Sequence, residues 1–133
     1  KGLLREGYTM VLEEFEYIFA PEQARECLPM WEDLGHITLI GHSHLCKVFA
    51  LTPTNVEELP PIDFQLEDNR KYIVSVGSVG QPRDGNWRSC YVILEEPWVT
   101  FRRVEYDVEV TANKIYDTPD LERFLGDRLR EGR

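Results

Sequence analysis

Two histidines, His42 and His44, are the residues of this chain best suited to hold a metal ion. They follow a short apolar run that is typical of a buried strand, and Gly41 lets the backbone turn sharply where that strand ends. Side chains of an extended segment alternate between faces, so we expect both imidazoles to point to one side. Open α/β sheets bind ligands past the carboxyl ends of their strands, and imidazole is a common metal ligand. The alternative is that both are ordinary loop residues.

A second stretch, residues 77–85, reads Gly-Ser-Val-Gly-Gln-Pro-Arg-Asp-Gly. Three glycines around a proline indicate a closely specified backbone path. Within it, the guanidinium of Arg83 is suited to bidentate contact with a substrate phosphate. Two alternatives stay open: the stretch is a structural turn between strands, and Arg83 forms a local ion pair with Asp84.

Helices and strands alternate around these two stretches, which predicts an α/β fold. Pro21 opens a helical pattern that Pro29 divides into two short helices, and a strand over 36–41 follows. Residues 1–20 fit either a helix or a strand. Thr118 is expected to cap a final helix. The other expected elements are a strand at 47–51, a loop at 57–61, and strands at 63–67, 71–76, 89–95 and 98–107.

Composition sets limits on the partners. The 133 residues fit one domain, and 24 acidic against 15 basic residues leave a net charge of −9, which repels nucleic acid. No apolar run approaches the roughly 20 residues that a membrane span needs. Three cysteines without a CxxC pair favour reduced, buried thiols and a cytoplasmic location.

The two stretches, in this order, resemble the carboxyl half of the calcineurin-like metallophosphoesterases, and especially the small bacterial and archaeal phosphodiesterases among them. Residues 41–44, Gly-His-Ser-His, are similar to that family's last metal motif, Gly-His-(Thr/Ser)-His. Residues 77–83 match its Gly-Ser-Val-Gly-Gln-Pro-Arg motif, and residues 104–107 resemble its final strand. Family members usually have Asn-Pro before the Gly-Ser, where this chain has Ser75 and Val76.

The resemblance implies an α/β sandwich of two sheets flanked by helices (αββα), of which residues 1–133 form the C-terminal portion of a single domain. It implies that His42 binds one divalent metal ion and His44 a second, in a hydrolase that acts on a small phosphomonoester or phosphodiester. Imidazole suits Mn, Fe, Zn, Ni and Co alike, so the metal is not specified.

The family's remaining metal motifs are not found in this sequence: Asp-x-His, Gly-Asp-x-x-Asp, Gly-Asn-His-Asp/Glu and one further histidine. The third histidine, His36, is interpreted as a strand-end residue. Since two imidazoles cannot fill two metal shells of about four donors each, we expect a missing N-terminal half to supply the rest. The chain alone should be inactive, and its exposed sheet edges should pair with that half or with a second copy. The alternative is a binding or scaffold module that kept the fold but lost the metal site.

Overall fold

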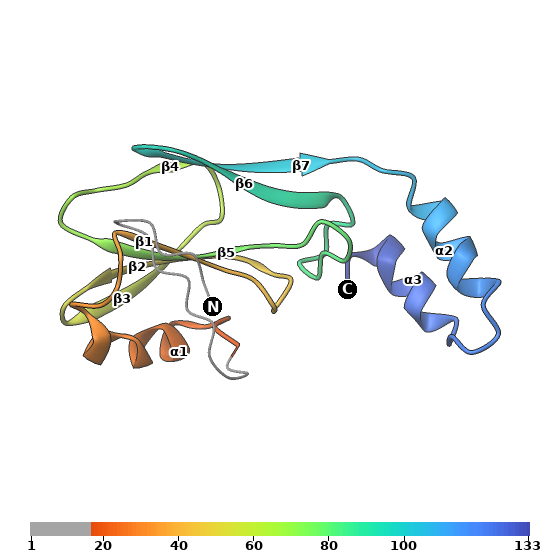
Figure 1. The fold of residues 1–133 in the computed structure, drawn as a ribbon, viewed down its shortest axis with the longest axis horizontal. Coiled ribbons are helices and arrows are strands. Elements are labelled where there is room, and N and C mark those ends of the chain that lie inside the picture. The colour runs from red at the N-terminus through yellow and green to blue at the C-terminus, as the bar shows by residue number, and fades with distance from the viewer. Residues whose placement is uncertain (1–16) are drawn as a thin grey trace.

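Two β-sheets form the centre of the computed structural model, which describes residues 17–133 (Figure 1). Sheet A has the strand order β1-β5-β2-β3, and sheet B has the order β4-β7-β6. The strands are β1 (Ile37–Ile40), β2 (Cys46–Thr52), β3 (Asn55–Leu59), β4 (Phe64–Gln65), β5 (Lys71–Val76), β6 (Ser89–Glu95) and β7 (Trp98–Val104). The helices are α1 (Pro21–Glu26), a 3-10 turn (Leu28–Met30), α2 (Val108–Tyr116) and α3 (Phe124–Glu131).

Both faces of sheet A are covered by other elements. Alternate side chains of its strands point to opposite faces and therefore pack into two different layers. On β2, Val48 and Ala50 face sheet B, while Phe49 and Leu51 face α1. Figure 1 shows the resulting layers, with sheet B on one side of sheet A and α1 on the other. The core between the sheets contains Ile37, Val48, Ala50, Leu66, Tyr72, Val74 and Val99.

Strand β1 runs parallel to β5, and β5 pairs antiparallel with β2. The parallel register matches Ile40 with Ser75, so the carboxyl ends of β1 and β5 lie at one edge of sheet A. Both stretches singled out in the sequence begin at that edge. The expected α/β sandwich is confirmed, as are two short helices in the first helical segment, although they meet at Cys27 and Pro29 lies inside the 3-10 turn.

Helices α2 and α3 pack against each other beyond the ends of the strands (Figure 1). Asp107 caps α2 by accepting a hydrogen bond from the amide of Val110 at 3.1 Å. The prediction that Thr118 caps a helix start was wrong: its hydroxyl donates to the carbonyl of Lys114 in the last turn of α2. The final helix begins only at Phe124.

The prediction of a loop at 57–61 was also wrong, since residues Asn55–Leu59 form strand β3. Val56 is buried, whereas Glu57 and Glu58, on opposite faces of this edge strand, are both exposed. Their charges are paired: Glu58 lies 2.5 Å from Lys47 on β2, and Glu57 lies 3.0 Å from Arg70, which directly precedes β5. Across residues 17–133, the structure contains no helix of the length and apolar character needed to cross a membrane.

Candidate metal and phosphate site

The His-Ser-His turn begins where β1 ends, at Ile40, and its backbone is not extended. His42 has φ +77° and His44 has φ +61°, and they are the two non-glycine residues in the described part of the chain with positive φ. The extended geometry assumed from the sequence is therefore wrong. Left-handed backbone is uncommon for a histidine and persists only where the surroundings hold it in place.

A buried serine pair holds the turn. Ser75, at the carboxyl end of β5, is fully buried, and its hydroxyl donates to the carbonyl of Leu45 at 2.7 Å. The hydroxyls of Ser75 and Ser43 lie 3.2 Å apart, and the Leu45 amide donates to the Ser43 hydroxyl at 3.3 Å. These contacts fix the residues on either side of His44 to the core of sheet A.

His44 also joins the two sequence stretches. Its Nδ1 lies 2.8 Å from the carbonyl oxygen of Gln81, and its own carbonyl accepts a hydrogen bond from the amide of Arg83 at 3.1 Å. A carbonyl can only accept, so Nδ1 carries the proton in the neutral imidazole. The lone pair of Nε2 is then left as the donor for a metal ion.

His42 is exposed, and one face of its ring is covered by Tyr17. The ring centroids lie 4.3 Å apart with an angle of 20° between the planes. His36 lies at the other end of β1, where its Nε2 is 3.0 Å from the carbonyl oxygen of Glu67. That contact agrees with its interpretation as a strand-end residue.

The loop of residues 77–88 connects β5 to β6 and is held along its length. Gly77 has φ +80°, which favours glycine, and the Gln81 amide donates to the Ser78 hydroxyl at 2.9 Å. The amide of Gly85 donates to the carbonyl of Gly132, just past α3, at 3.0 Å. The C-terminal end of the chain therefore lies against this loop (Figure 1).

Arg103 on β7 supports the loop from the sheet B side. Its guanidinium pairs with Asp84 and donates to the carbonyl oxygen of Arg88 at 3.2 Å. Burial lowers the pKa of Arg103, but the Asp84 carboxylate and two nearby cysteines raise it, and the net pKa lies above its usual value. Since Asp84 pairs with Arg103, the local Arg83–Asp84 ion pair considered from the sequence is not formed.

Arg83 is exposed, and its Nη2 lies 3.1 Å from the side-chain oxygen of Gln81. Its guanidinium therefore contacts the side chain of the residue whose backbone carbonyl holds His44. Motif spacing singled out His42, His44 and Arg83 as candidates. No local signal marked Ser75 or Arg103 as supports, because their partners are distant in sequence.

Two cysteines, Cys46 on β2 and Cys90 on β6, meet behind this loop with their sulfurs 3.1 Å apart. The hydrogen bond from Cys46 lowers the pKa of Cys90 to about 7, although burial opposes the shift. The same hydrogen bond, together with burial, raises the pKa of Cys46.

The donor set for a metal ion is only partly present. In the part of the chain that the structure describes, no three residues among His, Cys, Asp and Glu gather closely enough to hold a metal. The chemistry of His42 and His44 fits a divalent transition metal, but they provide fewer donors than one shell needs. At this turn, residues 17–133 therefore supply only part of the ligands of a metal centre.

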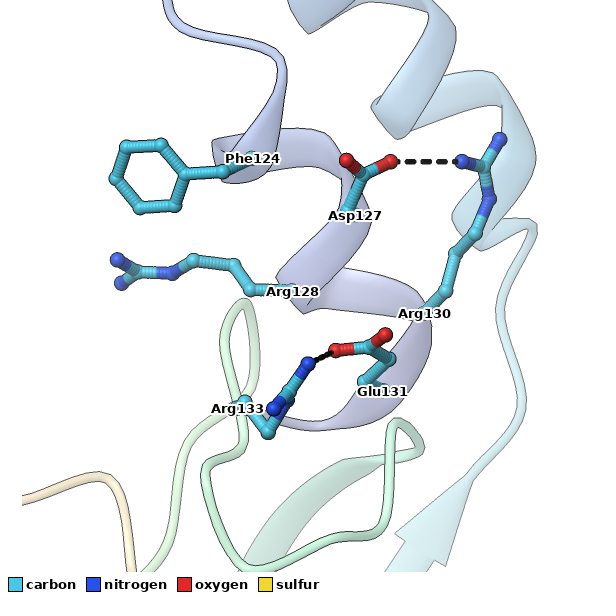
Figure 2. Close-up of a pocket in the computed structure, with 6 residues that line it drawn as sticks. All are labelled: Phe124, Asp127, Arg128, Arg130, Glu131 and Arg133. Atoms are coloured by element: carbon cyan, nitrogen blue, oxygen red, sulfur yellow. Dashed lines mark hydrogen bonds and ion pairs between the residues drawn. The ribbon is translucent and has the colours of Figure 1, made fainter.

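A pocket elsewhere, on α3, is lined by charged side chains that mostly neutralise each other (Figure 2). Arg130 lies 3.5 Å from Asp127, and Arg133 pairs with Glu131. Figure 2 shows Phe124 and Arg128 extending in the same direction, with the guanidinium 6.0 Å from the ring centroid. These pairings leave little net charge to attract an ion.

Comparison with known proteins identifies what this arrangement is similar to. No protein-family model matches the chain. An uncharacterized protein of Methanocaldococcus jannaschii is 35% identical over 127 residues, which is 91% of this chain and 47% of that protein. The crystal structure of a metallophosphoesterase from Sphaerobacter thermophilus matches with a TM-score of 0.79 and 25% identity, over 98% of this chain and 58% of that one. The chain thus spans about half the length of these relatives.

Proposed function

The chain has the fold of the carboxyl-terminal part of a metallophosphoesterase, and we propose that it contributes metal ligands to a hydrolase of phosphate esters. The proposal rests on the backbone conformation of the two histidines and on the hydrogen bond of the His44 ring. Both hold left-handed backbone at a strand end, and the Nδ1 of His44 is engaged so that Nε2 stays available. Backbone in this conformation costs free energy and clusters at functional sites, so two histidines held in it at a strand end support a functional turn.

In this proposal His42 binds one divalent metal ion and His44 binds the other, as the family resemblance implies. When bound, such ions activate water and neutralise a phosphate. The chain's own residues position the site: the Gln81 carbonyl orients the His44 ring, and Ser75 holds the turn. Arg83 offers its exposed guanidinium to a phosphate oxygen, which its bidentate geometry suits.

The remaining metal ligands come from residues outside 17–133 in this proposal. Two imidazoles supply two donors, whereas each ion needs about four. Residues 1–133 alone should therefore bind metal weakly and show no turnover, while the protein encoded by the complete reading frame should be active. The substrate is a small phosphomonoester or phosphodiester.

The test is hydrolysis of nitrophenyl phosphate and bis(nitrophenyl) phosphate in Mn²⁺ by the protein of the complete reading frame. His42→Ala and His44→Ala should each abolish turnover, whereas His36→Ala, a matched control at the other end of β1, should retain it. Equal activity in all three variants would contradict the proposal. Inactivity of the unsubstituted protein, with Mn²⁺, Zn²⁺ and Co²⁺ each supplied, would favour the scaffold alternative.

A further inference from the structure

Cys46 and Cys90 are placed to join the two sheets. Cys46 begins β2 in sheet A, and Cys90 lies in β6 of sheet B, so they come from opposite sides of the sandwich. Their exposed fractions are 5% and 1%, and the 3.1 Å between their sulfurs is the closest approach of thiols in the described chain. Cys27, the third cysteine, belongs to the α1 side of sheet A.

The surroundings leave this pair little freedom to separate. A Cβ added at Gly77 would lie 2.7 Å from the sulfur of Cys46 and 2.9 Å from the Cβ of Cys90. On another side, the Nη2 of Arg103 donates to the Cys46 sulfur at 3.1 Å. The amide of Cys90 donates to the carbonyl of Ser78 at 2.8 Å, which fixes its backbone. Both sulfurs are therefore held facing each other.

We propose that Cys46 and Cys90 form a reversible disulfide that links sheet A to sheet B when the protein meets a peroxide. A disulfide needs a sulfur–sulfur distance of about 2.05 Å, so the sulfurs must approach by roughly 1 Å, which is within reach of small side-chain rotations. In a reducing compartment such bonds are typically transient and redox-sensing. This inference does not depend on the proposed hydrolase activity.

The reaction balances with hydrogen peroxide as oxidant. One cysteine sulfur attacks a peroxide oxygen, forming a sulfur–oxygen bond as the oxygen–oxygen bond breaks, and the released hydroxide takes that thiol's proton to give water. The other sulfur then attacks the sulfenic sulfur. The sulfur–sulfur bond forms, the sulfur–oxygen bond breaks, and a second water leaves with the second thiol's proton. Two electrons pass from the sulfurs to the peroxide, and a thiol reductant restores the pair.

The experiment treats the folded protein with hydrogen peroxide, blocks free thiols with iodoacetamide under denaturing conditions, and maps the peptides. Trypsin leaves Cys27 and Cys46 in one peptide, 26–47, so a glutamate-specific protease is used, which separates 27–32, 33–57 and 68–95. We expect peptides 33–57 and 68–95 to become joined, with loss of alkylation at both cysteines, while Cys27 stays alkylated. Dithiothreitol should reverse the change.

Three controls keep the test decisive. Cys27→Ser should form the same link, and Cys90→Ser should form none. Oxidation in concentrated urea should give a mixture of all three pairings, since the unfolded chain does not select among them. Retained alkylation at Cys46 and Cys90 in the folded protein, or the same mixture of pairings as in urea, would overturn the proposal.

Discussion

The Nδ1 atom of His44 lies 2.8 Å from the carbonyl oxygen of Gln81, which joins the His-Ser-His turn to the 77–88 loop. The backbone amide of Arg83 adds a second link to the carbonyl of His44. Because both links use backbone groups of the loop, the path of the loop itself determines the orientation of the imidazole. The glycines and the proline, which specify the path of that loop, therefore help to orient the imidazole of His44.

This contact predicts the tautomer of His44. The neutral ring should carry its proton on Nδ1, because the Gln81 carbonyl can only accept, and Nε2 should be unprotonated. Long-range proton–nitrogen correlation spectra of the three histidines distinguish the two ring nitrogens. An Nε2-protonated His44 would contradict the geometry, because Nδ1 would then face the carbonyl without a proton.

Gly77→Ala should destabilise the protein by about 1–3 kcal/mol. The new methyl would meet Cys46 and Cys90 below 3 Å, and φ +80° is unfavourable for alanine. Gly80→Ala is the matched control in the same loop, since a Cβ there has no neighbour within 4 Å. Urea unfolding of the two variants measures the difference. Equal midpoints would show that the 77–88 loop is not held against the cysteines.

Ser75→Ala should cost about 1–3 kcal/mol, because it removes the donor to the half-buried Leu45 carbonyl and the buried partner of Ser43. Ser89→Ala is the control: it also removes one hydroxyl-to-carbonyl hydrogen bond, to Val79, but at an exposed site. Thermal melts should show a clearly larger loss for Ser75→Ala. If the losses were equal, the serine pair would not be what holds the turn.

Gly126→Ala in α3 should be destabilising, although alanine in a helix interior ordinarily gains about 1 kcal/mol over glycine. The added Cβ would lie 2.5 Å from the ring of Tyr116 on α2 and 3.2 Å from the carbonyl oxygen of Ala112. On a Tyr116→Ala background most of that cost should disappear. A double-mutant cycle of the unfolding free energies measures this coupling, and additive effects would exclude the contact.

Local patterns were sufficient to predict much of the sandwich. The strands of sheet A other than β3 consist mainly of β-branched and apolar residues, whose alternation matches the two faces that the structure buries. Strand β3 was missed because Glu57 and Glu58 resemble a solvated loop, whereas pairing with β2 decides its conformation. Helix α2 was missed because Val108, Val110 and Thr111 have low helix propensity, which packing against α3 overrides.

The site shows the same division between local and long-range information. His42 and His44 were predicted from a short motif, because neighbouring residues define it. The left-handed backbone of the turn was not predicted from the sequence. The contacts that hold this conformation come from Ser75 and the Gln81 carbonyl, more than thirty positions away. Arg103 contacts Cys46 across 57 positions, and no spacing rule connects a strand of one sheet with a strand of the other.

The most direct test of the central claim is a Mn²⁺ titration followed by the imidazole carbon–proton signals of the three histidines. Mn²⁺ broadens signals of nearby nuclei, and His36 at the far end of β1 is an internal control in the same molecule. We expect selective broadening of the His42 and His44 signals, and in His44→Ala the His42 signal should still broaden more than that of His36, because His42 binds its own ion. Equal broadening of all three histidines, or none at millimolar Mn²⁺, would contradict a metal site at this turn.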